Sequence, residues 1–246
     1  MERYDFKTQR LFVDQPLAGG AAFEADRAQA NYLLNVLRLK DGAKVLIFNG
    51  IDGEWLTSIG QSGRKACKLK IEYQIRPQPA PSSLIYCFAP LKQGRLDYMI
   101  QKAVEMGAGV LQPVITQHTQ ITKLNMERVK ANALEAAEQC GILSIPTINK
   151  PVKLTQFLID WDKEHKLLFA DESADDVNPI SALSDISRTE QKGLLVGPEG
   201  GFSAEERKAL LTLEYVRPIS LGPRILRADT AAVAALAVIQ SACGDW

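Results

Sequence analysis

Histidine and cysteine are scarce in this sequence of 246 residues. It contains two histidines, His118 and His165, and four cysteines that form no Cys-x-x-Cys pair. Metal sites and disulfide frameworks require such residues at short, regular spacings. The composition therefore predicts no bound metal ion, and it predicts cysteines that are buried or incidental.

Long apolar stretches are also missing. No run of 18 apolar residues could span a membrane, and residues 1–12 lack the basic and then apolar pattern of a secretion signal. With 46% hydrophobic and 24% charged residues, the composition is typical of a soluble globular protein, which we expect in the cytoplasm. The sequence has neither a Gly-x-Ser-x-Gly elbow nor a His-Glu-x-x-His helix, so hydrolase and metalloenzyme functions lose support.

The chain has no excess charge of either sign, but its two parts differ. Residues 1–80 contain 12 Lys/Arg and 9 Asp/Glu, and the remainder contains 17 and 20. Because clustered positive charge attracts phosphates, the first part is the better candidate for contacting a nucleic acid. An excess of this size is also compatible with ordinary solvated surface charge.

The first part of the chain has the pattern of a small β-rich domain. Short apolar or alternating runs predict strands over residues 10–13, 44–48, 54–59 and 68–73. Asn49-Gly-Ile-Asp-Gly53 supplies turn residues for a hairpin between two of them. Apolar residues at helical spacing predict one helix over residues 28–39.

A proline-rich segment predicts the domain boundary, because three of the six residues at 76–81 are prolines. We therefore expect domains at 1–76 and 82–246. In the second, strand and helix patterns alternate, which predicts a parallel sheet covered on both faces. The expected elements are strands at 83–89 and 110–115, helices at 95–106 and 125–140, and further segments at 154–161 and 166–170.

Two glycine-containing turns stand out in the last quarter. The first, Gly197-Pro-Glu-Gly-Gly-Phe202, follows an apolar strand at 193–196 and precedes Ser203-Ala-Glu-Glu206, which has the spacing of a capping box. Open α/β sheets bind ligands where a strand ends, and glycines let a ligand approach the backbone. The turn matches neither a dinucleotide fingerprint nor a phosphate loop, and taken alone it is also compatible with a plain turn.

The second turn, Leu221-Gly-Pro-Arg-Ile-Leu-Arg-Ala-Asp-Thr230, follows a predicted strand at 216–221 and leads into an alanine-rich helix at 231–237. Alanine favours helix formation, and small side chains also let another backbone come close. Such a helix suits a tightly folded chain end or a subunit contact.

Together, residues 195–203 and 221–231 resemble the 16S ribosomal RNA uracil-N3 methyltransferases of the SPOUT superfamily. The resemblance extends through residues 88–92, 101–107, 113–116 and 135–140. It implies an α/β fold: a SPOUT-type, trefoil-knotted domain with a parallel sheet that binds S-adenosylmethionine, preceded by a small PUA-like β-barrel domain that contacts RNA. It also implies a homodimer that acts on 16S ribosomal RNA of the small ribosomal subunit. His118 and Ile142 stand where the family leads us to expect arginines, which removes two possible donors to RNA phosphates and leaves the cofactor site unchanged.

The resemblance also implies roles for individual residues. The cofactor would be held by residues of the two turns, namely Leu195, Gly197, Gly200, Gly201, Leu221, Gly222, Ile225 and Leu226. The catalytic candidates are Arg227, which would face the uracil oxygens or a phosphate, and the carboxylates Glu199 and Asp229, which would remove the N3 proton or orient the base. Asp229 stands where the family commonly has Glu, and capping the last helix is an equally good explanation for it.

Arg10, Arg38 and Lys92 are the candidate RNA contacts, with ordinary surface charge as the alternative for each arginine. The sequence thus predicts an S-adenosylmethionine-dependent enzyme that methylates N3 of a uridine in 16S ribosomal RNA. Two alternatives stay open. One is another RNA methyl transfer, such as transfer to a ribose 2′-hydroxyl, and the other is a non-catalytic RNA-binding assembly module.

Overall fold

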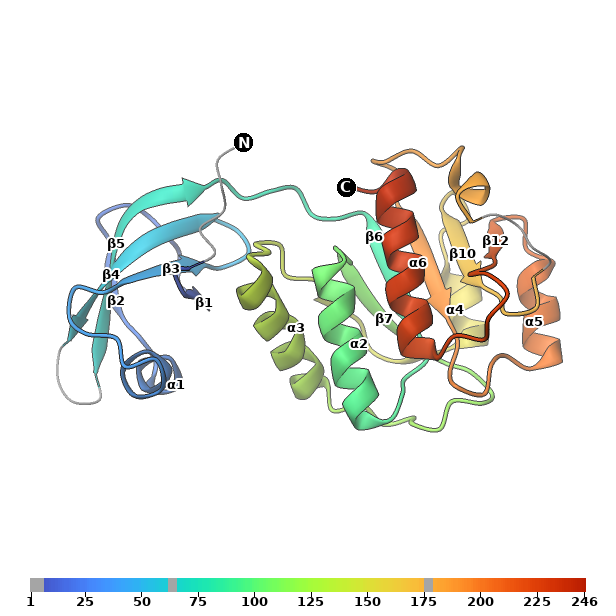
Figure 1. The fold of residues 1–246 in the computed structure, drawn as a ribbon, viewed down its shortest axis with the longest axis horizontal. Coiled ribbons are helices and arrows are strands. Elements are labelled where there is room, and N and C mark those ends of the chain that lie inside the picture. Colours follow the sequence, from blue (N-terminus) through green and yellow to red (C-terminus); the bar gives the residue numbers. More distant parts are fainter. Residues whose placement is uncertain (1–6, 62–65, 175–178) are drawn as a thin grey trace. The chain divides into compact units, whose positions relative to one another are not determined.

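The computed structural model describes residues 7–61, 66–174 and 179–246. Contacts divide the chain into two units (Figure 1). The first comprises Met1–Ala80 and Ala137–Ile145, and the second comprises Pro81–Ala136 and Pro146–Trp246. The boundaries expected from the sequence, 1–76 and 82–246, do not place segment 137–145 in the first unit.

A five-stranded sheet forms the first unit. Its strands are β1 (Arg10–Phe12), β2 (Ala22–Glu24), β3 (Lys44–Phe48), β4 (Glu54–Gln61) and β5 (Cys67–Arg76), in the order β1-β3-β4-β5-β2. β3 and β4 pair antiparallel, which confirms the hairpin predicted at Asn49–Gly53. Gly50 and Gly53 both have φ of 81°, a value that favours glycine. One face of the sheet packs on a core that includes Leu33, Val45 and Leu69.

The predicted helix in this unit is shorter and less regular than its apolar pattern suggests. α1 (Arg27–Asn31) begins with a capping box between Asp26 and Gln29 and continues into the π-helical turn η1 (Tyr32–Val36). Arg38 then adopts φ of 54°, which ends the helical run. The wider π turn still buries Leu33 in the core of the unit.

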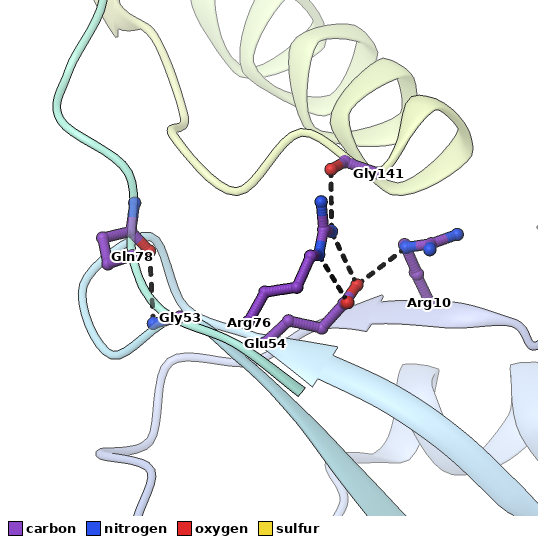
Figure 2. A network of polar contacts seen from close by, with 6 residues as sticks. All are labelled: Arg10, Gly53, Glu54, Arg76, Gln78 and Gly141. Carbon is purple, nitrogen blue, oxygen red and sulfur yellow. Dashed lines mark hydrogen bonds and ion pairs between the residues drawn. The ribbon is translucent and has the colours of Figure 1, made fainter. Parts of the chain in front are cut away.

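Segment 137–145 is held in the first unit by hydrogen bonds that its sequence does not reveal (Figure 2). The carbonyl oxygen of Gly141 accepts from Arg76 Nη2 at 2.9 Å, and the Glu138 carboxylate accepts from the amide of Phe12 at 2.8 Å. Gln78 Nε2 donates to the Leu143 carbonyl at 3.3 Å. These partners are more than 60 residues apart in sequence, so local patterns could not predict them.

The second unit contains the expected parallel sheet. Its strands are β6 (Leu84–Phe88), β7 (Val110–Ile115), β8 (Thr147–Ile148), β9 (Val152–Lys153), β10 (Lys166–Ala170), β11 (Lys192–Val196) and β12 (Val216–Ile219). The order is β12-β10-β11-β6-β7-β8, and β9 pairs with β7. Every pairing in it is parallel. Pro218 lies in β12, an edge strand, where a missing backbone donor is tolerated.

Helices cover both faces of this sheet, as predicted. The helices of the unit are α2 (Gln93–Glu105), α4 (Leu154–Asp160), α5 (Ala204–Leu211) and α6 (Ala228–Cys243), with a short 3-10 turn, η2 (Ser181–Leu183). α3 (Met126–Cys140) also belongs to it up to Ala136, and its last residues, 137–140, belong to the first unit. α4 and α5 contribute to the core on one face, which includes Phe157, Leu195 and Leu210. α6 packs beside α2 and against β11 (Figure 1). Sheet and helices therefore leave the carboxyl ends of the strands available for a site.

Two features common in other protein classes are not found among residues 7–61, 66–174 and 179–246. No helix in these ranges is both long and apolar enough to cross a bilayer. In the same ranges, His, Cys, Asp and Glu side chains do not gather in groups of three that could hold a metal ion.

Candidate active site

A cavity of about 400 Å³ opens in the second unit where β10, β11 and β12 end. This is the edge at which open parallel sheets bind ligands. Three chain segments contribute most of the lining, each following one strand, and arginines of α2 and α5 complete it. The lining comprises residues 169–174, 196–199, 201–202 and 219–228 together with Arg95, Arg207 and Ala231.

The glycines of the first turn make room for protein groups rather than for a ligand. A Cβ at Gly197 would stand 2.6 Å from the ring of Phe202, which itself packs edge-on against Phe169 with ring centroids 5.0 Å apart. Gly201 has φ of 68°, and its amide donates to the Pro198 carbonyl at 3.0 Å. A Cβ at Gly200 would stand 3.2 Å from Cβ of His118. These glycines therefore shape a compact turn, and the approach of a ligand to their backbone stays a prediction.

The capping box after the first turn is present as predicted. The amide of Glu206 donates to Ser203 Oγ at 3.2 Å, and the amide of Ser203 donates to Glu206 Oε2 at 3.0 Å. The other carboxylate oxygen of Glu206 accepts from the amide of Gln117 at 2.8 Å. The box thus starts α5 and also attaches the loop after β7 to the first turn of that helix.

The second turn is the more open of the two. Gly222 has φ of 96°, and the position of a Cβ there has no heavy atom within 4 Å. Ile225 is 89% exposed although it lines the cavity. An apolar side chain in that position has contact surface available for a ligand or a partner.

Four arginines line the cavity, and two of them are held by carboxylates. Arg207 Nε lies 3.0 Å from each oxygen of Asp171, which is buried. Arg95 lies 3.5 Å from Glu199. Within the described ranges, neither Arg224 nor Arg227 has a carboxylate at ion-pair distance, and both are exposed. Of the four arginines, Arg224 and Arg227 are therefore the two whose positive charge is available to a substrate.

The three catalytic candidates have different positions. Glu199 and Arg227 line the cavity, and Asp229 does not. The N-cap residue of α6 is Arg227, so Asp229 lies in the first helical turn rather than at the cap. Its Oδ1 is buried and has no hydrogen-bond partner among the described residues, and the same holds for the hydroxyl of Tyr86. Burial raises the pKa of Tyr86 well above its usual value, with smaller contributions from Cys87 and from the charge of Asp229.

Six of the eight residues expected to bind the cofactor line the cavity: Gly197, Gly201, Leu221, Gly222, Ile225 and Leu226. Leu195 and Gly200 do not, since Leu195 is fully buried within β11 and Gly200 contacts His118. Sequence reasoning missed Asp171 and Glu172, which line the wall after β10. The signal was available, because two acidic residues directly follow a predicted strand.

The candidate RNA contacts also differ in exposure. Arg10 is 8% exposed, and its Nε donates to the Glu54 carboxylate at 2.8 Å. This burial argues against the phosphate contact expected for Arg10. Arg38 and Lys92 are exposed, and Lys92 is the N-cap residue of α2.

The cavity suits S-adenosylmethionine, the cofactor that the sequence resemblance implies. Small-molecule pockets have volumes of about 300–1,000 Å³, and this cavity falls within that range. At Gly222 a ligand can approach the backbone without meeting a Cβ. Glu172 and Glu199 supply negative charge for a ligand that carries sulfonium and ammonium groups, and Leu226 supplies apolar contact.

Comparison with known proteins gives the same family over most of the chain. An RNA methyltransferase domain family matches residues 78–240, and an RNA methyltransferase PUA domain family matches residues 25–72. Ribosomal RNA small subunit methyltransferase E of Rickettsia conorii is 32% identical over 235 residues, which cover 95% of this chain and 96% of that protein. The protein of the same name from Bacillus subtilis is 27% identical over 246 residues, covering 94% and 95%.

Two solved structures have the same fold. A Legionella pneumophila protein described as a methyltransferase, solved with bound S-adenosylmethionine, is 29% identical with a TM-score of 0.82, covering 97% of this chain and 98% of that one. Ribosomal RNA small subunit methyltransferase E of Neisseria gonorrhoeae, also solved with S-adenosylmethionine, is 24% identical with a TM-score of 0.85, covering 97% and 99%. The expected fold class, a SPOUT-type α/β unit with a parallel sheet and a PUA-like β unit, is confirmed. The chain belongs to the ribosomal RNA small subunit methyltransferase E family of RNA methyltransferases.

Proposed function

We propose that this protein is an S-adenosylmethionine-dependent enzyme that methylates N3 of a uridine in 16S ribosomal RNA of the small ribosomal subunit. One observation carries the proposal. A single cavity is lined by both glycine turns, by a carboxylate, Glu199, and by an arginine without an acidic partner in the described ranges, Arg227. The cofactor site and the groups that the chemistry needs are therefore adjacent.

Methylation of uracil N3 makes two demands on the protein. The N3 proton has to leave, and the negative charge that develops on the flanking carbonyl oxygens has to be stabilised. The bound cofactor supplies an electrophilic methyl group. The protein has to hold the uracil ring in line with that group and exclude water from it.

Arg227 meets the second demand. It is a permanent cation with a planar fork of donors, which suits the carbonyl oxygens of a uracil ring. Its position at the N-terminus of α6 adds the positive end of a helix dipole, which also favours negative charge on the ring.

Glu199 is the better of the two candidates for accepting the N3 proton. It lines the cavity, and its partner Arg95, at 3.5 Å, holds the side chain without enclosing it, since the Glu199 side chain is 28% exposed. Asp229 lies one turn into the helix with a buried oxygen. We assign Asp229 a positioning role at the start of α6.

RNA recruitment rests on exposed cations outside the cavity. Arg38 in the first unit and Lys92 at the start of α2 are both exposed and suit phosphate contacts. We infer a homodimer because Ala231, Ala234 and Ala237 form a half-buried row of small side chains on α6, where another backbone could come close. The enzyme would act in the cytoplasm, where the small subunit is assembled.

The test uses labelled S-adenosylmethionine and small ribosomal subunits from a strain that lacks the homologous enzyme. We expect label in 16S ribosomal RNA, and mass analysis of its nucleosides should identify N3-methyluridine. A ribose-methylated product would instead establish 2′-O transfer. Cofactor binding without any transfer to subunits or free RNA would point to a non-catalytic assembly module.

A further inference from the structure

The loop that follows β7 lies against the first glycine turn and places one histidine on it. His118 Nδ1 lies 3.0 Å from the carbonyl oxygen of Gly200 and 3.2 Å from that of Gly201. A Cβ at Gly200 would stand 3.2 Å from Cβ of His118, so glycine at this position permits the close contact. Gly201 itself lines the cavity, and the histidine therefore contacts a wall of the proposed cofactor site from outside.

The two partners of Nδ1 determine where the imidazole proton lies. A carbonyl oxygen can only accept a hydrogen bond, so Nδ1 has to be the donor to both. The tautomer of a histidine is set by such contacts, and here the neutral ring carries its proton on Nδ1. The lone pair of a neutral His118 is then on Nε2, on an exposed ring.

The loop that carries His118 is itself anchored. The Thr116 amide donates to Thr119 Oγ1 at 2.9 Å, and the Thr119 amide donates to the Thr116 carbonyl at 3.2 Å. The neighbouring amide, that of Gln117, donates to the capping carboxylate of Glu206. These hydrogen bonds fix the backbone of the loop, and the fixed backbone holds the His118 side chain beside the turn.

Few backbone hydrogen bonds define the turn at this place. Gly201 has φ of 68°, a conformation that costs conformational entropy to fix. Apart from the bonds within regular helices and strands, no backbone amide of the described residues donates to the carbonyl oxygen of Gly200 or Gly201. The imidazole N–H is therefore a donor that the carbonyl oxygens of Gly200 and Gly201 share.

We propose that His118 is a positioning residue of the cofactor site, which holds the turn Pro198–Gly201 in its binding conformation through a shared Nδ1–H hydrogen bond. This assigns the side chain to the turn rather than to an RNA phosphate, the role of the arginine expected at this place. The consequence for cofactor affinity rests on the proposed function, whereas the hydrogen bond itself does not.

The first experiment measures the tautomer. Long-range ¹H–¹⁵N correlation of the imidazole nitrogens is simple in a chain with two histidines, because His118→Asn removes one set of signals and leaves that of His165. We expect the neutral His118 ring to carry its proton on Nδ1. A neutral ring protonated on Nε2 would overturn the proposal, whatever the enzyme is found to methylate.

The second experiment compares three variants by calorimetry with S-adenosylmethionine. In His118→Asn the amide nitrogen can replace Nδ1, in His118→Gln it extends toward the place of Nε2, and His118→Ala has neither. We expect His118→Asn to bind within about threefold of wild type and the other two to bind about tenfold more weakly, the scale of one hydrogen bond. Equal affinity in all three variants would overturn the role in positioning.

Amide hydrogen exchange of Gly201 supplies a readout that needs no cofactor. Its amide donates to the Pro198 carbonyl at 3.0 Å, and this bond closes the turn. Exchange should be faster in His118→Ala and His118→Gln than in wild type and His118→Asn. If wild type shows the expected tautomer and protection but does not bind S-adenosylmethionine, the proposed function fails and the role of His118 in the turn stands.

Discussion

Glu54 accepts hydrogen bonds from Arg76 through both carboxylate oxygens, at 2.8 Å to Nε and 2.9 Å to Nη2 (Figure 2). Arg10 Nε donates to the same carboxylate at 2.8 Å, and Glu54 is 1% exposed. One buried anion thus holds two guanidinium groups. Arg76 in turn donates to the carbonyl of Gly141, at the end of α3.

Glu54→Ala should strongly destabilise the protein, because it leaves the nearly buried charge of Arg10 without its carboxylate. Loss of one partner from a buried ion pair typically costs about 3–5 kcal/mol. Urea denaturation measures the loss. Glu127→Ala removes an exposed carboxylate that pairs with Lys130 at 3.2 Å, and should change stability by at most about 1 kcal/mol. Similar small effects in both variants would contradict the importance of the buried pair.

Gly201→Ala should weaken binding of S-adenosylmethionine. At φ of 68° an L-residue is strained by about 1–2 kcal/mol, and the new Cβ would stand 3.0 Å from the Glu172 carboxylate. Calorimetry should show an affinity reduced by roughly tenfold. Gly94→Ala is the matched control, since a Cβ in this first turn of α2 meets nothing within 4 Å and alanine favours a helix. Wild-type affinity in Gly201→Ala would remove the first turn from the site.

Arg227→Ala should lower the rate of methyl transfer by about 10²- to 10³-fold, the effect of losing one donor to a developing negative charge. Cofactor affinity should change little. Single-turnover measurements with saturating RNA separate the chemical step from binding. Arg224→Ala provides the comparison, because Arg224 is also exposed and lines the same cavity. If both variants lose the same amount of activity, Arg227 has no special role at the reacting base.

Glu199→Gln should be slow at neutral pH and should partly recover at higher pH, because solvent hydroxide can then remove the N3 proton. Asp229→Asn should retain most of the rate, since a positioning side chain in the first turn of α6 is well replaced by its amide. A pH–rate profile of both variants decides between them. The opposite pattern, with Asp229→Asn slow and Glu199→Gln active, would transfer the role of base to Asp229.

Asp185→Asn should remove a contribution to the free energy of unfolding that depends on pH. The hydrogen-bonded guanidinium of Arg217 lowers the pKa of Asp185 from 3.8 to about 2. Because the pKa is lower in the folded state, this contribution is fully present above pH of about 4 and is lost as the pH falls toward 2. The free energy of unfolding, measured from pH 7 to pH 2, should show wild type more stable than the variant above pH of about 4, and the difference should shrink as the pH falls toward 2. A stability difference that stays constant with pH would exclude the Asp185–Arg217 pair as the origin of the effect.

The division of the chain also changes what a truncation would do. The boundary expected from the sequence, at residues 76–82, would allow residues 1–76 to be removed as one module. The structure packs segment 137–145 in the first unit, where Phe12 and Arg76 contact Glu138 and Gly141. The truncation would remove both of these partners, so the segment is the place where such a fragment should be least stable.

The sequence by itself determined the features that depend on neighbouring residues. The hairpin turn at Asn49–Gly53, the capping box at Ser203–Glu206, the alternating pattern of a parallel sheet and the two motifs of the family all lie within short windows. Turn chemistry, capping and periodicity act between residues a few positions apart, which is why a linear pattern can reveal them.

Only the tertiary structure decided which distant groups each long side chain meets. Glu54, 44 residues away in sequence, lies beside Arg10, and His118, 82 residues away, lies against Gly200. Charge and size give a side chain many possible partners. The folded backbone determines which of these partners lies within contact distance, and a local sequence pattern contains no information on that.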